Sequence, residues 1–240
     1  MSSWHKPEGA LWAPTLGSVA FEGFCRMFFT FYCPLRVEGR EHLPDGPFLL
    51  CSNHSSHADS AALMTATGRR FNGFAMVGAS DYFIDSRKLR WLVGPGMNLI
   101  PIERQPGPKS LYSCLAICRR FLEETGGILI LYPEGTRSPD GRMGAFKSGA
   151  GLFATELGLP LVPAHVEGTH HVLPKGRSVP HPGRVKVRFG EALSLTSFGA
   201  SPALLRDQRR SVVEQLERSV RSLGGVAQPQ ELVAPMHEKG

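Results

Sequence analysis

The sequence of 240 residues has no uninterrupted apolar run of about 18 residues, the length that a membrane-spanning helix needs, so no such helix is expected. Its five cysteines are an odd number and include no Cys-x-x-Cys pair. A disulfide framework or a zinc knuckle is therefore not expected, and reduced thiols are the simplest interpretation. The first residues, MSSWHKPEG, contain no basic segment leading into an apolar one, so we expect no secretory signal. The Gly-x-x-x-x-Gly-Lys-[Ser/Thr] sequence of a P-loop is absent too, as is any internal repeat.

What the sequence does have is a globular composition with a modest excess of positive charge. Hydrophobic residues make up 42% and charged residues 20%, which excludes wholesale disorder. The 27 Lys and Arg residues outnumber the 21 Asp and Glu residues, and the net charge is +6. This balance predicts an anionic partner, which could be nucleic acid, an anionic membrane surface or a phosphorylated substrate. The length suits a single domain with a short appendage.

An aromatic-rich segment near the start, LWAPTLGSVAFEGFCRMFFTFYCPL, predicts a helix bracketed by Pro14 and Pro34. Glu22 and Arg26 are four residues apart, so they fall on one face of that helix and can pair. Four phenylalanines recur at helical spacing and form an apolar stripe: Phe21, Phe24, Phe28 and Phe31. This amphipathic pattern is typical of a helix that lies in a membrane interface, and a helix buried against the core is the alternative.

Beyond this segment, short apolar runs alternate with helical patterns. Strands are expected at 47–53, 71–79, 98–102, 128–132, 161–166 and 184–189. Helices are expected at 60–67, from an N-cap at Ser110 to a stop at Gly126, at 151–157 and at 202–223. Most of the strands are continuously apolar, as in strands buried on both faces. The alternation predicts an α/β fold, a single domain with a mixed, mainly parallel sheet flanked by helices.

These patterns divide the chain into three parts. Residues 1–35 form the interfacial helical segment, 36–223 the domain, and 224–240 a tail expected to be disordered. Within the domain, RVKVRF at 184–189 alternates strictly, as in an edge or half-exposed strand with a basic outer face. Five Lys and Arg residues and no acidic residue lie between 169 and 190, so part of the positive charge is concentrated there.

The first polar cluster, NHSSHAD at 53–59, directly follows a buried strand, where functional residues of α/β folds collect. His54 and Asp59 would point about 140° apart on one regular helix. They can meet only if His54 lies on the turn and Asp59 begins the helix. Asp59 could then fix the imidazole tautomer and leave the other ring nitrogen as a general base. An N-cap aspartate beside a polar loop histidine is the open alternative.

A metal site is a second interpretation of the same cluster. His54, His57 and Asp59 give H-x-x-H-x-D, superficially similar to the H-x-H-x-D-H of metallo-hydrolases. The spacing differs by one residue, and Ser60 follows the aspartate where that motif has histidine. Further ligands could come from elsewhere in the chain, which keeps this alternative open: His165, His170, His171 and His181.

The second polar cluster, YPEGTRS at 132–138, also follows a buried strand. Gly135 and the turn-rich SPDG after it expose backbone N–H groups near Arg137. A guanidinium matches phosphate oxygens, so this cluster predicts a phosphate site. Glu134 could pair with Arg137 or organise the loop. A plain surface turn is the alternative.

Four blocks of this sequence together resemble the glycerophospholipid acyltransferase family, typified by 1-acylglycerol-3-phosphate acyltransferases. NHSSHAD looks like the family's H-x-x-x-x-D motif, and GMNLIPIER, which ends at Arg104, is similar to its second motif. LYPEGTRS resembles the third motif and LPLVPAHVEGT the fourth. The blocks occur in the family's order and cover roughly residues 35 to 195. An amphipathic or hydrophobic N-terminal anchor is also common in the family.

The resemblance implies an O-acyltransferase of phospholipid biosynthesis. A fatty acyl group would pass from an acyl thioester, on coenzyme A or acyl carrier protein, to the hydroxyl of a lysophospholipid, first of all 1-acylglycerol-3-phosphate, giving phosphatidic acid. His54 would be the general base and Asp59 its orienting partner, without an acyl-enzyme, a metal or a bound cofactor. Arg104 and Arg137 would bind the acceptor phosphate. The residues shaping the site would be Glu134, Gly135 and Thr136.

The implied partners are the two substrates, acyl carrier protein where it is the donor, and an anionic membrane surface, with the protein peripheral on its cytoplasmic face. No nucleic-acid motif is present. Members that act on lysophosphatidic acid often have a lysine where Ser80 and Asp81 stand here, and the family often has an aromatic residue where His57 stands. A different lysolipid or another hydroxylated or aminated acceptor is therefore an alternative. A metal-dependent hydrolase and a non-catalytic lipid- or phosphate-binding protein are the others.

Overall fold

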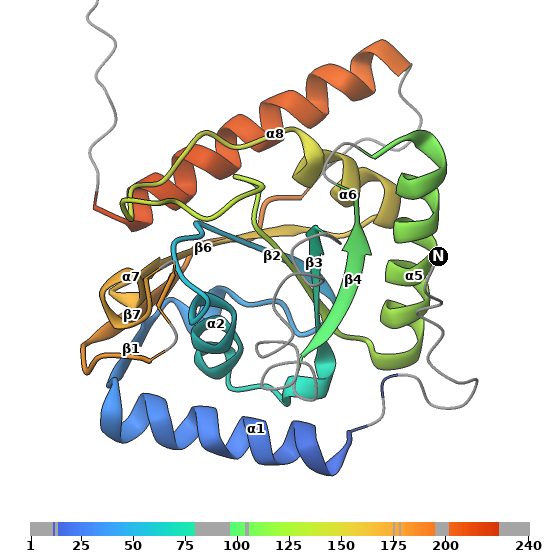
Figure 1. Ribbon diagram of the computed structural model, residues 1–240. Coiled ribbons are helices and arrows are strands. Elements are labelled where there is room, and N and C mark those ends of the chain that lie inside the picture. Colours follow the sequence, from blue (N-terminus) through green and yellow to red (C-terminus); the bar gives the residue numbers. More distant parts are fainter. Residues whose placement is uncertain are drawn as a thin grey trace, which may run out of the picture.

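The computed structural model describes residues 12, 14–79, 97–103, 106–174, 176–177, 179–194 and 202–225. Its centre is a seven-stranded sheet in the order β1-β7-β6-β2-β5-β3-β4 (Figure 1). Neighbouring strands are parallel except for β6 and β7, which confirms the mixed, mainly parallel sheet. The strands are β1 (Leu35–Glu38), β2 (Phe48–Ser52), β3 (Phe74–Ala79), β4 (Asn98–Ile102), β5 (Ile128–Leu131), β6 (Leu161–Glu167) and β7 (Val185–Phe189).

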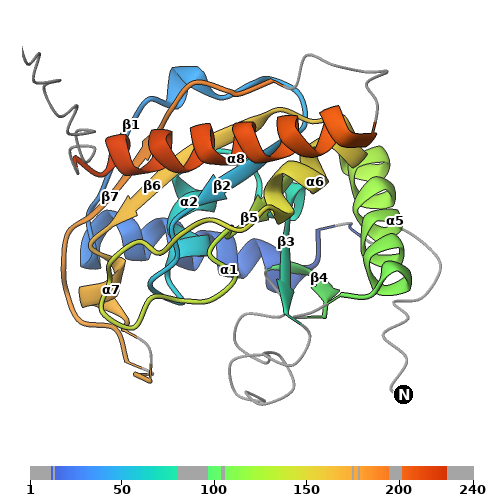
Figure 2. The same cartoon turned by 90° about the horizontal axis from the view of Figure 1, so that it is seen from above.

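Helices cover both faces of the sheet (Figures 1 and 2). One face carries α1 (Leu16–Met27) and α2 (Asp59–Thr67). The other face carries α5 (Pro108–Thr125), α6 (Gly149–Leu157) and α8 (Pro202–Leu223). Short helical turns complete the described structure: Phe28–Tyr32, Arg40–His42, Phe71–Gly73 and α7 (Thr169–Val172).

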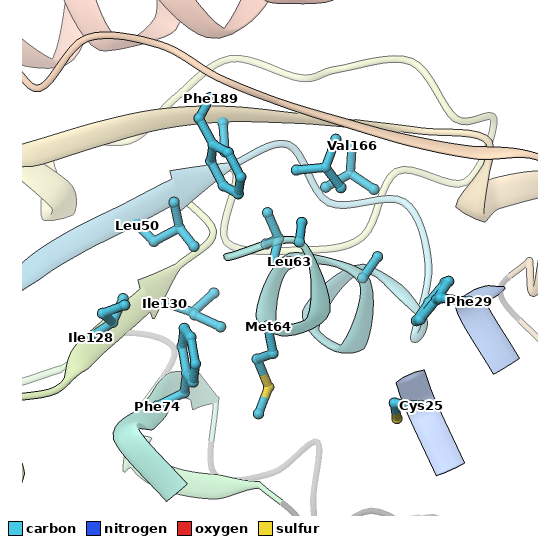
Figure 3. Packing of buried hydrophobic residues seen from close by; sticks show 14 of the residues in the cluster. Cys25, Phe29, Leu50, Leu63, Met64, Phe74, Ile128, Ile130, Val166 and Phe189 are labelled. Carbon is cyan, nitrogen blue, oxygen red and sulfur yellow. The ribbon is translucent and has the colours of Figure 1, made fainter. Parts of the chain in front are cut away.

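The central strand β2 shows why the apolar runs become strands of a two-sided sheet. All five of its residues are buried. Leu50 packs with Leu63 and Ile130 between the sheet and α2 (Figure 3). Leu49, which points to the opposite face because side chains alternate along a strand, packs in the layer under α5, α6 and α8 with Phe121. The alternation of one strand thus feeds two separate apolar layers, as expected for a parallel sheet buried on both faces.

Several details differ from the sequence-based expectations. The helix expected to begin with an N-cap at Ser110 begins three residues earlier, with Gly107 as N-cap and Pro108 in the first turn, where proline is favoured. The expected end is confirmed, because Gly126 closes the helix in the left-handed conformation with a φ of +58°. Two four-residue elements, β1 and α7, were not anticipated, since neither LRVE nor THHV is long enough to show a period.

The basic strand β7 lies between β1 and β6, so the prediction of an edge strand is wrong. Its side chains alternate between buried and half-buried, which confirms the half-exposed pattern. The position at the edge is taken by β1, which pairs with β7 in parallel. The sequence does not predict the short strand β1, because it contains two charged residues and only two apolar ones.

The N-terminal helix is both packed on the domain and apolar on its outer side. Thr15 caps α1, and the π-helical turn Phe28–Tyr32 extends it. Cys25 and Phe29 are buried in the apolar layer beneath the sheet (Figure 3). Four large apolar side chains are nonetheless exposed, by 60–89%: Leu16 89%, Phe24 60%, Met27 63% and Phe31 81%. The helix therefore presents an apolar outer face while it is fixed to the core.

Polar contacts also tie α1 to the loop after α2. Glu22 pairs with Arg26 at 3.0 Å, as its spacing predicts, and its second oxygen accepts from the backbone N–H of Phe71 at 3.0 Å. Among the described residues, no helix has the length and apolar character that a membrane crossing requires. The interfacial location of α1 stays a prediction. Residues 1–11, and residues 226–240 of the expected tail, lie outside the described part of the chain.

Candidate active site

The loop between β2 and α2 brings His54 and Asp59 together. Nδ1 of His54 lies 2.9 Å from Oδ2 of Asp59, which is fully buried. The histidine is on the turn after β2 and the aspartate is the first residue of α2, the arrangement that their five-residue spacing requires. The alternative of an N-cap aspartate is wrong, because the N-cap position is occupied by Ala58.

Asp59 is surrounded by donors. Its Oδ2 also accepts from the backbone N–H groups of Ser55 at 2.7 Å and Ser56 at 2.9 Å. Its Oδ1 accepts from the hydroxyl of Thr169 at 2.5 Å. An ionised carboxylate can only accept hydrogen bonds, so Nδ1 of His54 carries the hydrogen in this pair. Nε2 then keeps its lone pair, which is the arrangement that a general base needs.

Thr169 was not anticipated as a site residue. It is the last residue of LPLVPAHVEGT and the first of α7, and it is fully buried. Its contact joins positions 110 residues apart in the sequence, so only the folded chain shows that β6 delivers a hydroxyl to Asp59.

Tyr132 contacts the imidazole ring of His54 and was also not predicted as a site residue. Its ring stacks on that of His54 with the centroids 3.8 Å apart and the planes 14° apart. Its hydroxyl lies 2.6 Å from the Oγ atom of Ser60 in α2, which fixes the outer end of the ring. Burial raises the pKa of the Tyr132 phenol well above its usual value, so the ring is neutral at physiological pH. The one sequence signal was its position directly after a buried strand.

Glu134 connects the two polar loops. Its Oε1 accepts from the backbone N–H of His54 at 2.8 Å, and its Oε2 accepts from that of Gly144 at 2.8 Å. The backbone N–H of Ser138 in turn donates to the carbonyl of His54 at 2.8 Å. These bonds confirm the expectation that Glu134 organises the loop. Burial raises the pKa of its carboxyl, while the two backbone donors lower it.

Two further side chains near the dyad, Arg137 and His57, differ in charge. Arg137 is half-buried, and burial lowers the pKa of its guanidinium, an effect that the negative charge of Asp59 opposes. Burial first, and then the positive charge of Arg137, lowers the pKa of His57 to about 4. His57 is therefore neutral at physiological pH, and the cationic group beside the dyad is the arginine.

The remaining predicted residues fall into two groups. Gly135 lies in the turn at the end of β5 with a φ of +71°, a conformation that favours glycine, and both it and Thr136 are exposed. Arg104 lies outside the described residues, as do Ser80 and Asp81. The structure thus brings six predicted residues to the carboxyl ends of the neighbouring strands β2 and β5. They are His54, Asp59, Glu134, Gly135, Thr136 and Arg137.

The metal interpretation of the same cluster finds no ligand group in the described part of the chain. There, no three His, Cys, Asp or Glu side chains come together in a way that could hold a metal ion. Both oxygens of Asp59 already accept hydrogen bonds from the protein. The H-x-x-H-x-D spacing of His54, His57 and Asp59 thus does not gather a ligand set in the fold.

Comparison with known proteins gives consistent matches. Residues 34–167 match the family model described as Acyltransferase. The chloroplastic 1-acyl-sn-glycerol-3-phosphate acyltransferase LPAT1 of Arabidopsis thaliana is 34% identical over 190 residues, 78% of this chain and 50% of the relative. The enzyme of the same name from Pseudomonas aeruginosa is 29% identical over 179 residues, 72% of this chain and 64% of the relative.

A solved structure is similar as well. The crystal structure of the 1-acyl-sn-glycerophosphate (LPA) acyltransferase PlsC from Thermotoga maritima matches with a TM-score of 0.59 and 28% sequence identity. The match covers 85% of this chain and 79% of that one. The chain spans about half the length of the plant relatives that it matches, 49% of the one from Brassica napus and 50% of the one from Arabidopsis thaliana.

Proposed function

The chain belongs to the acyltransferase family, and on that premise we propose that it transfers a fatty acyl group from an acyl thioester to the free hydroxyl of 1-acylglycerol-3-phosphate, giving phosphatidic acid. The relatives named for this activity support the acceptor. The observation that carries the proposal is the His54–Asp59 contact of 2.9 Å at the end of β2, which leaves one ring nitrogen of His54 as a base.

The proposed reaction is a direct acyl transfer. Nε2 of His54 takes the proton of the acceptor hydroxyl while the hydroxyl oxygen attacks the thioester carbonyl, and Asp59 stabilises the imidazolium that forms. The tetrahedral intermediate then collapses with cleavage of the C–S bond, and the thiolate leaves with the proton from His54. General-base catalysis of this kind contributes about 10²–10⁴-fold, and positioning of the two substrates supplies much of the rest.

The surrounding residues act on the orientation of the base. Thr169 fixes the carboxylate of Asp59 from one side, and Tyr132 fixes the plane of the imidazole. Glu134 holds the backbone of His54 against the loop that carries Arg137. All of these contacts are made within the protein itself, so they hold the dyad in the orientation that the proposed reaction needs.

Arg137 is the proposed ligand of the acceptor phosphate. A half-buried guanidinium is a poorly solvated cation, so a phosphate brought next to it gains a charge-assisted, bidentate contact. The exposed turn of Gly135 and Thr136 leaves room for the headgroup beside it. Arg104, which follows β4, is the second proposed phosphate ligand on the strength of its motif alone.

The donor and the location are also proposals. The donor is acyl-CoA or acyl-acyl carrier protein as a substrate, with no bound cofactor. The exposed side chains of Phe24 and Phe31 support a peripheral position of α1 on an anionic membrane surface, on its cytoplasmic face. A different lysolipid acceptor is the alternative, because the residues Ser80 and Asp81 differ from the common family pattern.

Transfer of a labelled acyl group by the purified full chain tests this function. The donors are acyl-CoA and acyl-acyl carrier protein, and the acceptors are lysophosphatidic acid, lysophosphatidylcholine and glycerol 3-phosphate. We expect labelled phosphatidic acid as the main product, at a rate that a chelator leaves unchanged. Product from another acceptor alone would correct the acceptor, and release of free fatty acid that a chelator abolishes would favour the metal-dependent hydrolase.

A further inference from the structure

A groove of about 750 Å³ opens beside the candidate active site. Asn53 and Ser55, which flank His54 in the chain, line it together with Glu167 and Gly168 at the end of β6. Its volume lies within the range of about 300–1,000 Å³ that is usual for small-molecule sites. We call this the basic groove, after its four cationic lining side chains: Arg36, Arg142, Arg184 and Lys186.

The strand order places the basic groove on one side of the dyad. Glu167 of β6 pairs with Lys186 of β7, and Leu35 of β1 pairs with Val185. The amino ends of β1 and β7 therefore meet the carboxyl end of β6 at the edge of the sheet where His54 lies. Strand β5, which leads to Arg137, lies on the other side of β2. The loop after β5 also reaches the groove with Asp140 and Arg142, but Arg137 is not one of the lining residues. The groove and the proposed acceptor-phosphate ligand are therefore separate features beside the dyad.

The acidic residues of the basic groove are already paired. Its acidic lining side chains are Asp140 and Glu167. Asp140 accepts from the Ser138 hydroxyl at 2.9 Å and from the backbone N–H of Arg142 at 3.1 Å. Glu167 pairs with Arg188, which lies outside the groove lining, at 2.9 Å. The groove therefore offers more positive than negative charge to a ligand.

Two of the four cations are available for a ligand. Arg36 and Lys186 share the carboxylate of Glu38 at 3.0 and 2.8 Å. The side chain of Arg142 is 90% exposed, and its Nε atom lies 3.9 Å from Oδ2 of Asp140, which is a long distance for an ion pair. Arg184 is exposed and forms no ion pair within the described residues. A guanidinium at such a position recognises phosphate oxygens well because its donors form a planar fork.

We propose that the basic groove binds the phosphorylated nucleotide end of coenzyme A when the donor is acyl-CoA, and this inference rests on the proposed function. The transfer has two substrates, and both must reach His54. With the acceptor phosphate at Arg137, which does not line the groove, the groove is left for the donor. Coenzyme A carries its phosphates on the nucleotide and its thioester at the end of a flexible pantetheine arm. The nucleotide at one end of the molecule would then lie in the groove while the thioester at the other end lies beside His54.

The shape of the groove favours coenzyme A over acyl carrier protein. A concave site of this volume fits a nucleotide-sized ligand, whereas a stable protein partner uses a broad face of about 800 Å² on each side. The four cations come from three separate parts of the chain: the start of β1, the loop after β5 and the start of β7. They therefore converge on one groove from different parts of the chain.

The test compares donors with and without phosphates. Steady-state rates are measured for the wild type and for Arg184→Gln and Arg142→Gln/Arg184→Gln, in neutral detergent micelles so that no anionic surface contributes. The donors are palmitoyl-CoA and palmitoyl-pantetheine, which has the same thioester without any phosphate. We expect the KM for palmitoyl-CoA to rise about tenfold in Arg184→Gln and further in the double variant. The rate with palmitoyl-pantetheine and the KM for lysophosphatidic acid should stay within about twofold of the wild type.

Arg120→Gln is the matched control. Arg120 is also an exposed arginine, and it pairs with Glu124 on α5, at the side of the sheet away from β1 and β7. Its replacement by glutamine changes the net charge as much as Arg184→Gln does. It should leave the KM for palmitoyl-CoA unchanged. Equal Tm values for all variants would show that the fold is intact, as expected for residues whose side chains are exposed.

Four results would overturn the inference. They are an unchanged KM for palmitoyl-CoA, an equal loss with both donors, a rise in the KM for lysophosphatidic acid alone, and a wild type that uses only acyl-acyl carrier protein. The proposed function survives all four, because acyl transfer itself is still observed. If the wild type transfers no acyl group from any donor, the proposed function fails. Calorimetric titration with coenzyme A then decides the groove, since weaker binding to Arg184→Gln than to Arg120→Gln supports it and equal binding refutes it.

Discussion

Replacement of Asp59 by asparagine removes the charge of the dyad with the smallest change of shape. Oδ2 accepts from the backbone of Ser55 and Ser56 and from His54. An asparagine with its carbonyl oxygen at this position keeps all three bonds. Its amide group then faces the hydroxyl of Thr169, which can turn from donor to acceptor. We expect the fold and the tautomer of His54 to persist while the negative charge is lost.

The expected cost to folding is much smaller than the cost to catalysis. Hydrogen bonds to a charged group contribute about 1.5–3 kcal/mol and neutral ones about 0.5–1.5 kcal/mol, and removal of a buried charge offsets part of the difference. We expect a loss of about 1–3 kcal/mol in the free energy of unfolding, which lowers Tm by several degrees. The neutral side chain cannot stabilise the imidazolium of His54. Since this stabilisation supports the general base, kcat should fall by about 10²–10⁴-fold.

The assay is acyl transfer from acyl-CoA to saturating lysophosphatidic acid, with Tm measured on the same preparation. Asp45→Asn, a substitution of an exposed aspartate, is the control and should match the wild type in both measurements. An Asp59→Asn variant that keeps kcat within about threefold of the wild type would refute the proposed role of the charge.

Three further predictions concern residues around the dyad and the outer face of α1. Thr169→Val leaves Oδ1 of Asp59 without its donor, so it should lower kcat by about tenfold without changing the KM values. Thr169→Ser should restore kcat, and a Thr169→Val variant as active as the wild type would contradict the positioning role. Arg137→Ala should raise the KM for the acceptor strongly, by about 10-fold or more, with little change in the KM for the donor; an unchanged acceptor KM would remove Arg137 from the phosphate site. The double variant Phe24→Ser/Phe31→Ser should weaken binding to anionic vesicles, measured by flotation, by about tenfold or more. Its Tm should not fall, because both side chains are exposed. The control Tyr112→Ser on α5 should bind the vesicles as the wild type does, and equal flotation of both variants would refute the interfacial helix.

The parts of the fold that the sequence predicts are those whose burial leaves a local pattern. The strand β5 reads ILIL because both of its faces are covered, and a run of that kind is visible without a structure. The strand β1 reads LRVE, four residues with half-exposed charges, and has no such pattern. The placement of β7 inside the sheet follows from the presence of β1, so the two errors have one cause.

The candidate site divides in the same way. The contact between His54 and Asp59 could be predicted as one of two alternatives, because their five-residue spacing permits it only if His54 lies on the turn and Asp59 begins the helix. Thr169 and Tyr132 could not be assigned from the sequence. Their contacts with the dyad join residues 110 and 78 positions apart, and these residues meet only because β2 lies between β5 and β6 in the sheet. Glu134 was found by its motif, but its bonds to the backbone of His54 and Gly144 needed the folded loops.

The most direct test of the account is kcat for acyl transfer from acyl-CoA to lysophosphatidic acid by His54→Ala. His42→Ala, a substitution of an exposed histidine in the turn Arg40–His42 between β1 and β2, is the control. If His54 is the general base, its loss should lower kcat by about 10²-fold or more, with Tm close to that of the wild type and His42→Ala fully active. Thioester-dependent acylation by His54→Ala at the wild-type rate would contradict the proposed mechanism.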